Sequence, residues 1–97
     1  MCHFTYLIQQ ELCAAMPRIT GIVSALRLAE QQRRAVPYGT ATIEVEVCEY
    51  DCTIMLNKGD EYLTIRVTED SDIERLGRLL ASFMYRAPCA GSRFITF

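Results

Sequence analysis

Hydrophobic and polar residues alternate in three short runs between Thr40 and Val67, which is the pattern of half-buried β-strands. The apolar positions recur with a period of two: Ala41, Ile43, Val45 and Val47; Cys52, Ile54 and Leu56; Leu63, Ile65 and Val67. Turn residues separate the runs, at 49–51 and 57–60, and Gly59 is available for a positive φ. The pattern predicts a three-stranded antiparallel meander with one face covered by helices.

A helix is predicted after the third run. Ser71 stands three residues before Glu74, which is the spacing of a capping box that satisfies free N–H groups at a helix start. The apolar residues that follow lie on one helical stripe: Ile73, Leu76, Leu80 and Phe83. Pro88 and Gly91 break the chain after Arg86, so the helix is expected to end there.

Two helical segments are predicted before the strands, and Pro17 separates them. The first covers Phe4 to Met16. The second begins near Ile19 and has apolar residues at helical spacing: Ile19, Ile22, Val23, Leu26 and Ala29. Gly21 costs this helix about 1 kcal/mol, and the β-branched residues around it leave a short strand as an alternative. Residues 36–39 (Val-Pro-Tyr-Gly) are expected to break the chain before the first strand.

The predicted fold class is therefore α+β: N-terminal helices, a three-stranded antiparallel meander and a C-terminal helix. A short apolar run at 93–97 follows and is able to pair at a sheet edge. No linker is long enough to separate two domains, so residues 1–97 are expected to form one domain.

The charge balance of ten basic against twelve acidic residues disfavours nucleic-acid binding, because that affinity depends on clustered Lys and Arg. Lys58 is the single lysine, and Arg33 and Arg34 are the only adjacent arginine pair. The cysteine count of five is odd, and the apolar runs fall short of the roughly 18 residues that span a bilayer. We expect a cytoplasmic, reduced protein without a membrane segment.

Candidate catalytic and metal-binding residues are few. The single histidine, His3, lies beside Cys2, and no nucleophile, base and orienting group can be assembled around it. Cys48 and Cys52 are four apart across a turn and with Cys2 and His3 would make four zinc ligands, but the strand period sends Cys52 inward and Cys48 outward. Glycine-rich phosphate loops are absent. The sequence predicts neither an enzyme nor a metal or other cofactor.

Glu44 and Glu46 share one strand face, roughly 7 Å apart, a spacing that also occurs in carboxylate pairs that act on sugars. No apolar pocket or third polar group can be placed around them, so the pair is interpreted as part of a solvated face. Arg66, on the third strand, is the expected cross-strand counter-charge.

The order of a helix, three strands and a helix from Ile22 to about Tyr85 resembles the C-terminal half of roadblock-type domains, the dynein light chain and GTPase-regulator family. The segments that carry the resemblance are 43–47, 52–56 with the turn 57–60, 63–67 and 72–80. The resemblance implies a protein without catalytic residues that dimerises through helices and sheet edges and serves as a platform for other proteins. The same order is similar to double-stranded-RNA-binding domains and to the Alu-binding proteins of the signal recognition particle, but both carry basic patches.

The leading hypothesis is a non-enzymatic protein interaction module, acting as a homodimer or as a small scaffold or regulatory subunit, since 51% apolar residues exceed what a small solvated monomer needs. The expected contact residues lie in the helical segments and the terminal run: Leu7, Ile8, Leu26, Arg27, Phe94, Ile95 and Phe97. The alternative is a small phage- or virus-encoded inhibitor that binds a host protein through an acidic surface: Glu44, Glu46, Glu49 and Asp51.

Overall fold

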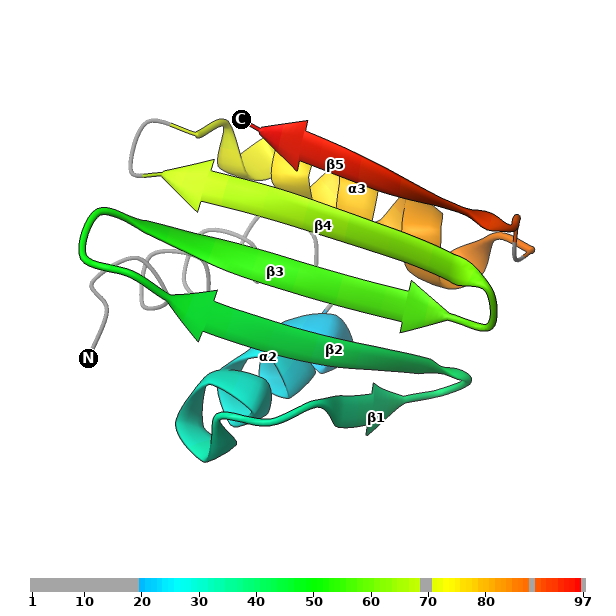
Figure 1. Cartoon of the computed structure of the whole chain (residues 1–97), viewed down its shortest axis with the longest axis horizontal. Coiled ribbons are helices and arrows are strands. Elements are labelled where there is room, and N and C mark those ends of the chain that lie inside the picture. Colours follow the sequence, from blue (N-terminus) through cyan, green and yellow to red (C-terminus); the bar gives the residue numbers. More distant parts are fainter. Residues whose placement is uncertain (1–19, 69–70, 88, 97) are drawn as a thin grey trace.

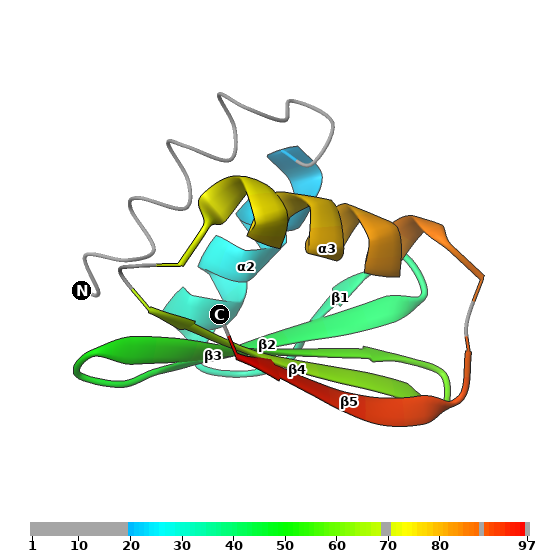
Figure 2. The ribbon, with the colours of Figure 1, turned by 90° about the horizontal axis from the view of Figure 1, so that it is seen from above.

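Five strands form one sheet in the order in which they follow one another along the chain, β1-β2-β3-β4-β5 (Figure 1). The computed structural model describes residues 20–68, 71–87 and 89–96. The elements are α2 (Thr20–Gln32), β1 (Val36–Tyr38), β2 (Ala41–Val47), β3 (Asp51–Lys58), β4 (Glu61–Thr68), α3 (Ile73–Tyr85) and β5 (Gly91–Thr96). Neighbouring strands from β1 to β4 are antiparallel, whereas β5 runs parallel to β4. Both helices lie on the same face of the sheet (Figure 2).

The prediction of a three-stranded antiparallel meander is wrong, because the sheet has five strands and is mixed. The segment expected to break the chain forms β1 instead. It tolerates Pro37 because β1 is an edge strand, where a residue without an N–H group costs no ladder hydrogen bond. The terminal apolar run forms β5, which pairs in parallel because α3 carries the chain back to the end of the sheet where β4 begins. The predicted helix at 4–16 lies outside the described residues.

Two-residue loops connect β1 to β2 and β3 to β4. Each loop begins with a glycine at positive φ, Gly39 at 60° and Gly59 at 61°. A glycine at the first loop position is typical of tight hairpins whose twist matches that of the flanking strands. The predicted role of Gly59 is confirmed.

The core lies between the two helices and the inner face of the sheet. The largest fully buried side chains are Phe83, Ile22, Ile43, Ile54, Leu56, Leu63, Ile65, Leu76, Leu80 and Val67. The burial patterns confirm the apolar stripes predicted for the two helices and the alternation predicted for β3 and β4. In β2 the alternation holds from Ala41 to Val45, whereas Val47 is 40% exposed. The structure also rejects the strand alternative for the residues around Gly21, which are helical from Thr20 onward.

Gly21 in helix α2 has a packing reason. A Cβ atom built at this position lies 2.9 Å from the hydroxyl oxygen of Tyr38 on β1. The missing side chain therefore lets the Tyr38 ring approach the helix. This contact offsets part of the free energy that a glycine costs in a helix interior.

Helix α3 begins with a different cap from the predicted one. Asp72 is the N-cap residue, and its Oδ1 accepts a hydrogen bond from the backbone N–H of Arg75 at 3.2 Å. The Ser71 hydroxyl oxygen accepts instead from the N–H of Thr68 at 2.9 Å and so closes the turn after β4. The predicted capping box is wrong because Ser71 lies one residue before the N-cap and its hydroxyl is already engaged with Thr68. A carboxylate is an equally good N-cap and also favours the positive end of the helix dipole.

Candidate functional site

The outer face of the sheet, opposite the helices, is covered by no element of the part of the chain that the structure describes (Figure 2). Alternation and register place three rows of side chains on this face: Thr42, Asn57, Tyr62 and Ser92; Glu44, Met55, Thr64 and Phe94; Glu46, Thr53, Arg66 and Thr96. Tyr62 is 54% exposed and Phe94 is 66% exposed. They lie on neighbouring strands in adjacent rows, because Phe94 pairs with Thr64, two residues after Tyr62. The outer face therefore presents two aromatic side chains near one edge and two glutamates near the other.

One edge of the sheet is only partly paired. Strand β1 pairs with β2 from Ala41 to Ile43, whereas β2 continues to Val47. Among residues 20–68, 71–87 and 89–96, no strand lies beside 44–47 on that side. We call residues 44–47 the free edge of β2.

The hydrogen-bond pattern shows which backbone groups face outward at the free edge. The N–H of Cys48 donates to the carbonyl of Asp51 at 2.9 Å. Because hydrogen-bonded and non-bonded pairs alternate in an antiparallel ladder, Glu44 and Glu46 direct their N–H and C=O groups toward β3. Val45 and Val47 direct theirs away from the sheet. The free edge thus offers two donors and two acceptors.

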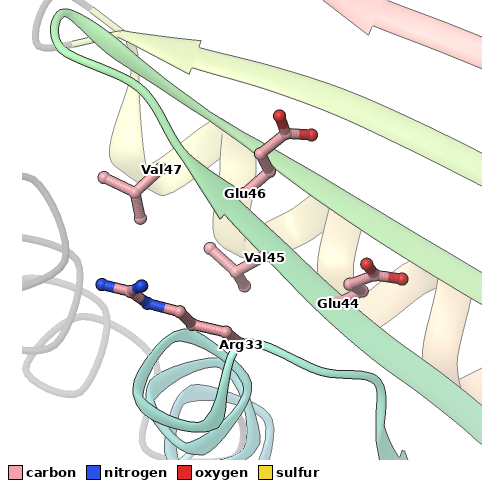
Figure 3. A pocket seen from close by; sticks show the side chains of 5 residues that line it. All are labelled: Arg33, Glu44, Val45, Glu46 and Val47. Atoms are coloured by element: carbon pink, nitrogen blue, oxygen red, sulfur yellow. The ribbon is translucent and has the colours of Figure 1, made fainter.

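An open depression of about 520 Å³ lies along the free edge, lined by Arg33 and residues 44–47 (Figure 3). Val45 and Val47 point to one side of the strand, and Glu44 and Glu46 point to the other. Arg33 follows α2 with φ at 52°, a left-handed conformation that ends the helix. Its side chain lies on the valine side of β2. The edge therefore has an acidic side and an apolar side, with a guanidinium beside the latter.

The four predicted acidic residues differ in their surroundings. Glu44, Glu46 and Glu49 are exposed, and none of the three forms an ion pair with another described residue. The half-buried Asp51 carboxylate accepts a hydrogen bond from Arg66 Nε at 2.6 Å. Arg66 therefore neutralises Asp51 and leaves the glutamates of β2 without the counter-charge expected for them.

The predicted contact residues do not share one surface. Leu26 is buried in the core at 3% exposure and offers no surface, whereas Arg27 is exposed on α2. Phe94 lies on the outer face, and Ile95 is half-buried against the core on the helix side. Leu7, Ile8 and Phe97 lie outside the described residues. Helix α2 covers one face of the sheet (Figure 2), and the register places the Phe94 side chain on the other.

A second polar group, the Glu61 cluster, consists of Lys58, Glu61, Arg86, Cys89 and Arg93. Lys58 and Glu61 are each 3% exposed. The Lys58 ammonium donates to the backbone carbonyls of Phe83 and, at 2.7 Å, of Arg86, at the end of α3. The Glu61 carboxylate pairs with the Arg86 guanidinium through both oxygens and also accepts from the Cys89 N–H at 3.3 Å. This cluster joins the β3–β4 turn to the chain between α3 and β5.

The Glu61 cluster has a structural role rather than a catalytic one. The hydrogen bond from Arg86 holds the pKa of the Glu61 carboxyl below its usual value of 4.5, against the opposing effect of burial. The carboxylate is ionised and both oxygens are engaged, so it is not poised as a general base or acid. Its inward position was available from the sequence, because Lys58 and Glu61 continue the inward series of β3 and β4.

Neither Cys48 nor Cys52 is placed as an activated nucleophile. Cys52 is buried and Cys48 is exposed, which confirms the orientations predicted from the strand period. Partial desolvation, followed by a hydrogen bond to Asp51 and repulsion from acidic neighbours, raises the pKa of the Cys48 thiol. The thiol is therefore held in its protonated, less nucleophilic form. Within the described ranges, no group of three His, Cys, Asp or Glu side chains is placed to hold a metal ion.

Neither described helix is long and apolar enough to cross a membrane. Comparison of the sequence with models of known protein families finds no match, and comparison with curated proteins finds no relative.

Proposed function

We propose that this protein is a non-enzymatic interaction module that acts as a homodimer or as a small regulatory subunit of a larger complex. The observation that carries the proposal is the uncovered outer face of the sheet, with Tyr62 and Phe94 exposed on it. Aromatic side chains are enriched at protein interfaces, where they contribute large contact areas at low entropic cost.

The positions of the two aromatic residues favour association over a role in folding. In the described part of the chain, the helices lie on one face of the sheet, and the buried core lies on that face. Tyr62 and Phe94 therefore contribute little to the monomer core, and Met55 lies half-buried between them and the glutamates of β2. A second copy packed on this face would bury these side chains, and two-fold symmetry is the commonest arrangement of such pairs.

The proposal is tested by the solution mass from light scattering over a concentration series. The double variant Tyr62→Ser and Phe94→Ser is expected to be monomeric with an unchanged circular dichroism spectrum, while the wild type dimerises. Tyr50→Ser is the matched control, because Tyr50 is 81% exposed in the β2–β3 turn and off the outer face. A wild type that stays monomeric at every concentration would contradict the homodimer. Substitution of Ile95 is uninformative, since its side chain packs against the core.

A second candidate function is inhibition or regulation of a basic protein through an acidic surface. The specific observation is that Glu44, Glu46 and Glu49 lack an ion-pair partner among the described residues. Exposed carboxylates of this kind accelerate association with a positively charged partner and make it sensitive to salt. Asp51 contributes less, because Arg66 neutralises it. Binding to a basic protein that does not weaken as the salt concentration rises would contradict this function.

A further inference from the structure

We infer that the free edge of β2 binds an extended segment of a partner protein as an added antiparallel strand, and that this segment carries Lys or Arg at alternate positions. The inference rests on the second candidate function and specifies its site and the class of its partner.

The backbone of the free edge is arranged for strand addition. The outward groups of Val45 and Val47 can form four hydrogen bonds with an antiparallel strand. Residues 44–47 extend over about 13 Å, which is enough for four residues of an added strand. Strand β1 already uses the same edge at 41–43, so the added strand would continue the line of β1. Addition of a strand to a sheet edge is a recurrent mode of peptide recognition.

The side chains of the free edge set the pattern of the added segment. Residues directly opposite each other in a ladder lie on the same face. On the outer face, the segment meets Glu44 and Glu46, which favour Lys or Arg. On the helix side, the segment meets the side chains of Val45 and Val47, and Arg33 lies close by. Val47 is 40% exposed. Apolar residues fit this side, and the guanidinium disfavours a basic one.

A second copy of β2 is a poor occupant of the same edge. The antiparallel pairing that uses both valines of each copy places Val45 opposite Val47 and Glu46 opposite Glu46. Like charges directly opposite each other destabilise a strand pair. The two glutamates therefore act against self-pairing while they favour a basic segment.

The probe is a fluorescein-labelled peptide of six residues, acetyl-Lys-Val-Lys-Val-Lys-Val-amide, and the readout is fluorescence anisotropy. Saturable binding is expected. The variant Glu44→Lys with Glu46→Lys should weaken it at least about tenfold. The matched control is Asp60→Lys with Glu74→Lys, which changes the net charge equally at two exposed positions away from the free edge. Equal losses in the two variants would overturn the inference.

N-methylated peptides separate strand addition from simple charge attraction. In an antiparallel pair, the valine amides of the peptide face β2 and the lysine amides face solvent. N-methylation of the valines should abolish binding, and N-methylation of the lysines should leave it within about twofold of the parent peptide. Peptides that bind equally well in a salt-sensitive manner would overturn strand addition and leave the acidic-surface function intact. Absence of binding by every peptide would overturn the site, whereas the light-scattering test of the dimer is independent of it.

Two further measurements show whether the free edge of β2 is occupied by something other than the peptide. Val47→Pro removes an N–H that does not pair with β3, so it should preserve the fold and weaken peptide binding. A change in molar mass caused by Val47→Pro would instead assign the edge to a second copy. Hydrogen exchange of the Val45 and Val47 amides should be fast in the free protein and slow with peptide. Slow exchange in the free protein would show that the edge is already paired, and this result would overturn the inference.

Discussion

Carboxylates at two corners of the same sheet have opposite surroundings. At the β3–β4 turn, Glu61 is 3% exposed, pairs with Arg86 and accepts a backbone hydrogen bond. On β2, Glu44 and Glu46 are exposed and form no ion pair within the described part of the chain. The sequence places acidic residues next to apolar ones at both corners, so composition alone does not distinguish them.

The difference shows how the direction of a side chain determines its role. Glu61 lies on the helix side, where an unpaired charge would be costly, and its partners are Lys58 on β3 and groups of the chain that follows α3. Glu44 and Glu46 point toward solvent and cost nothing when unpaired. The first corner therefore stabilises the fold, and the second remains available to a partner.

The largest effect on stability is expected from Lys58→Met. Loss of the ammonium leaves two carbonyls at the end of α3 without their donor and removes one cation beside the Glu61 carboxylate, which should lower the free energy of unfolding by about 2 to 4 kcal/mol. Urea denaturation measures this change. The control is Arg27→Met, which removes one positive charge from an exposed position and should change stability by less than about 0.5 kcal/mol. Similar values for the two variants would contradict a structural role for Lys58.

The next largest effect is expected on the pH dependence of folding stability, through Glu61. Because the folded-state pKa of Glu61 is lowered, its ionised form stabilises the fold fully above the ordinary value of 4.5, and this contribution is lost as the pH falls through the folded-state pKa. Glu61→Gln should therefore be less stable than the wild type at pH 7, and the difference should shrink below about pH 4.5. Denaturation at a series of pH values tests this expectation, with the exposed Glu74→Gln as the control. A difference that stays constant with pH would contradict the role of the ionised carboxylate.

The smallest effect on stability is expected from substitutions of the glutamates on β2. Glu44→Gln with Glu46→Gln removes two exposed charges that pair with no described residue, so the free energy of unfolding should change by less than about 0.5 kcal/mol per position. The same urea denaturation provides the measurement. A loss as large as that of Lys58→Met would show that the glutamates stabilise the fold and would remove the distinction between the corners.

The features that were predictable from the sequence are those set by local periodicity. The period of two placed Ile54 and Ile65 in the core, and the helical stripes placed Leu26 and Leu80 there. The same rule placed Cys52 inward and the glutamates of β2 outward, and the burial of these side chains confirms both orientations.

The remaining features depend on pairing between distant segments or on competition between neighbours. Strand β1 was missed because Pro37 is a strand breaker except at an edge, and the position of the edge is a property of the whole sheet. The free edge of β2 exists only because β1 stops pairing at Ile43, which no local pattern reveals. Arg66 pairs with Asp51 rather than with the glutamates, and this choice also depends on geometry across strands.

The parallel pairing of β5 with β4 also affects how the structure opens. Strands β1 to β4 join through short hairpins, whose contacts are local and form early, whereas β5 must wait for α3 to cross back over the sheet. Only Ile95 of β5 packs against the core, and the other residues of the strand are exposed. Strand β5 is therefore the part of the sheet expected to detach at the lowest free energy, and its detachment would expose the backbone of β4 while the hairpins remain folded.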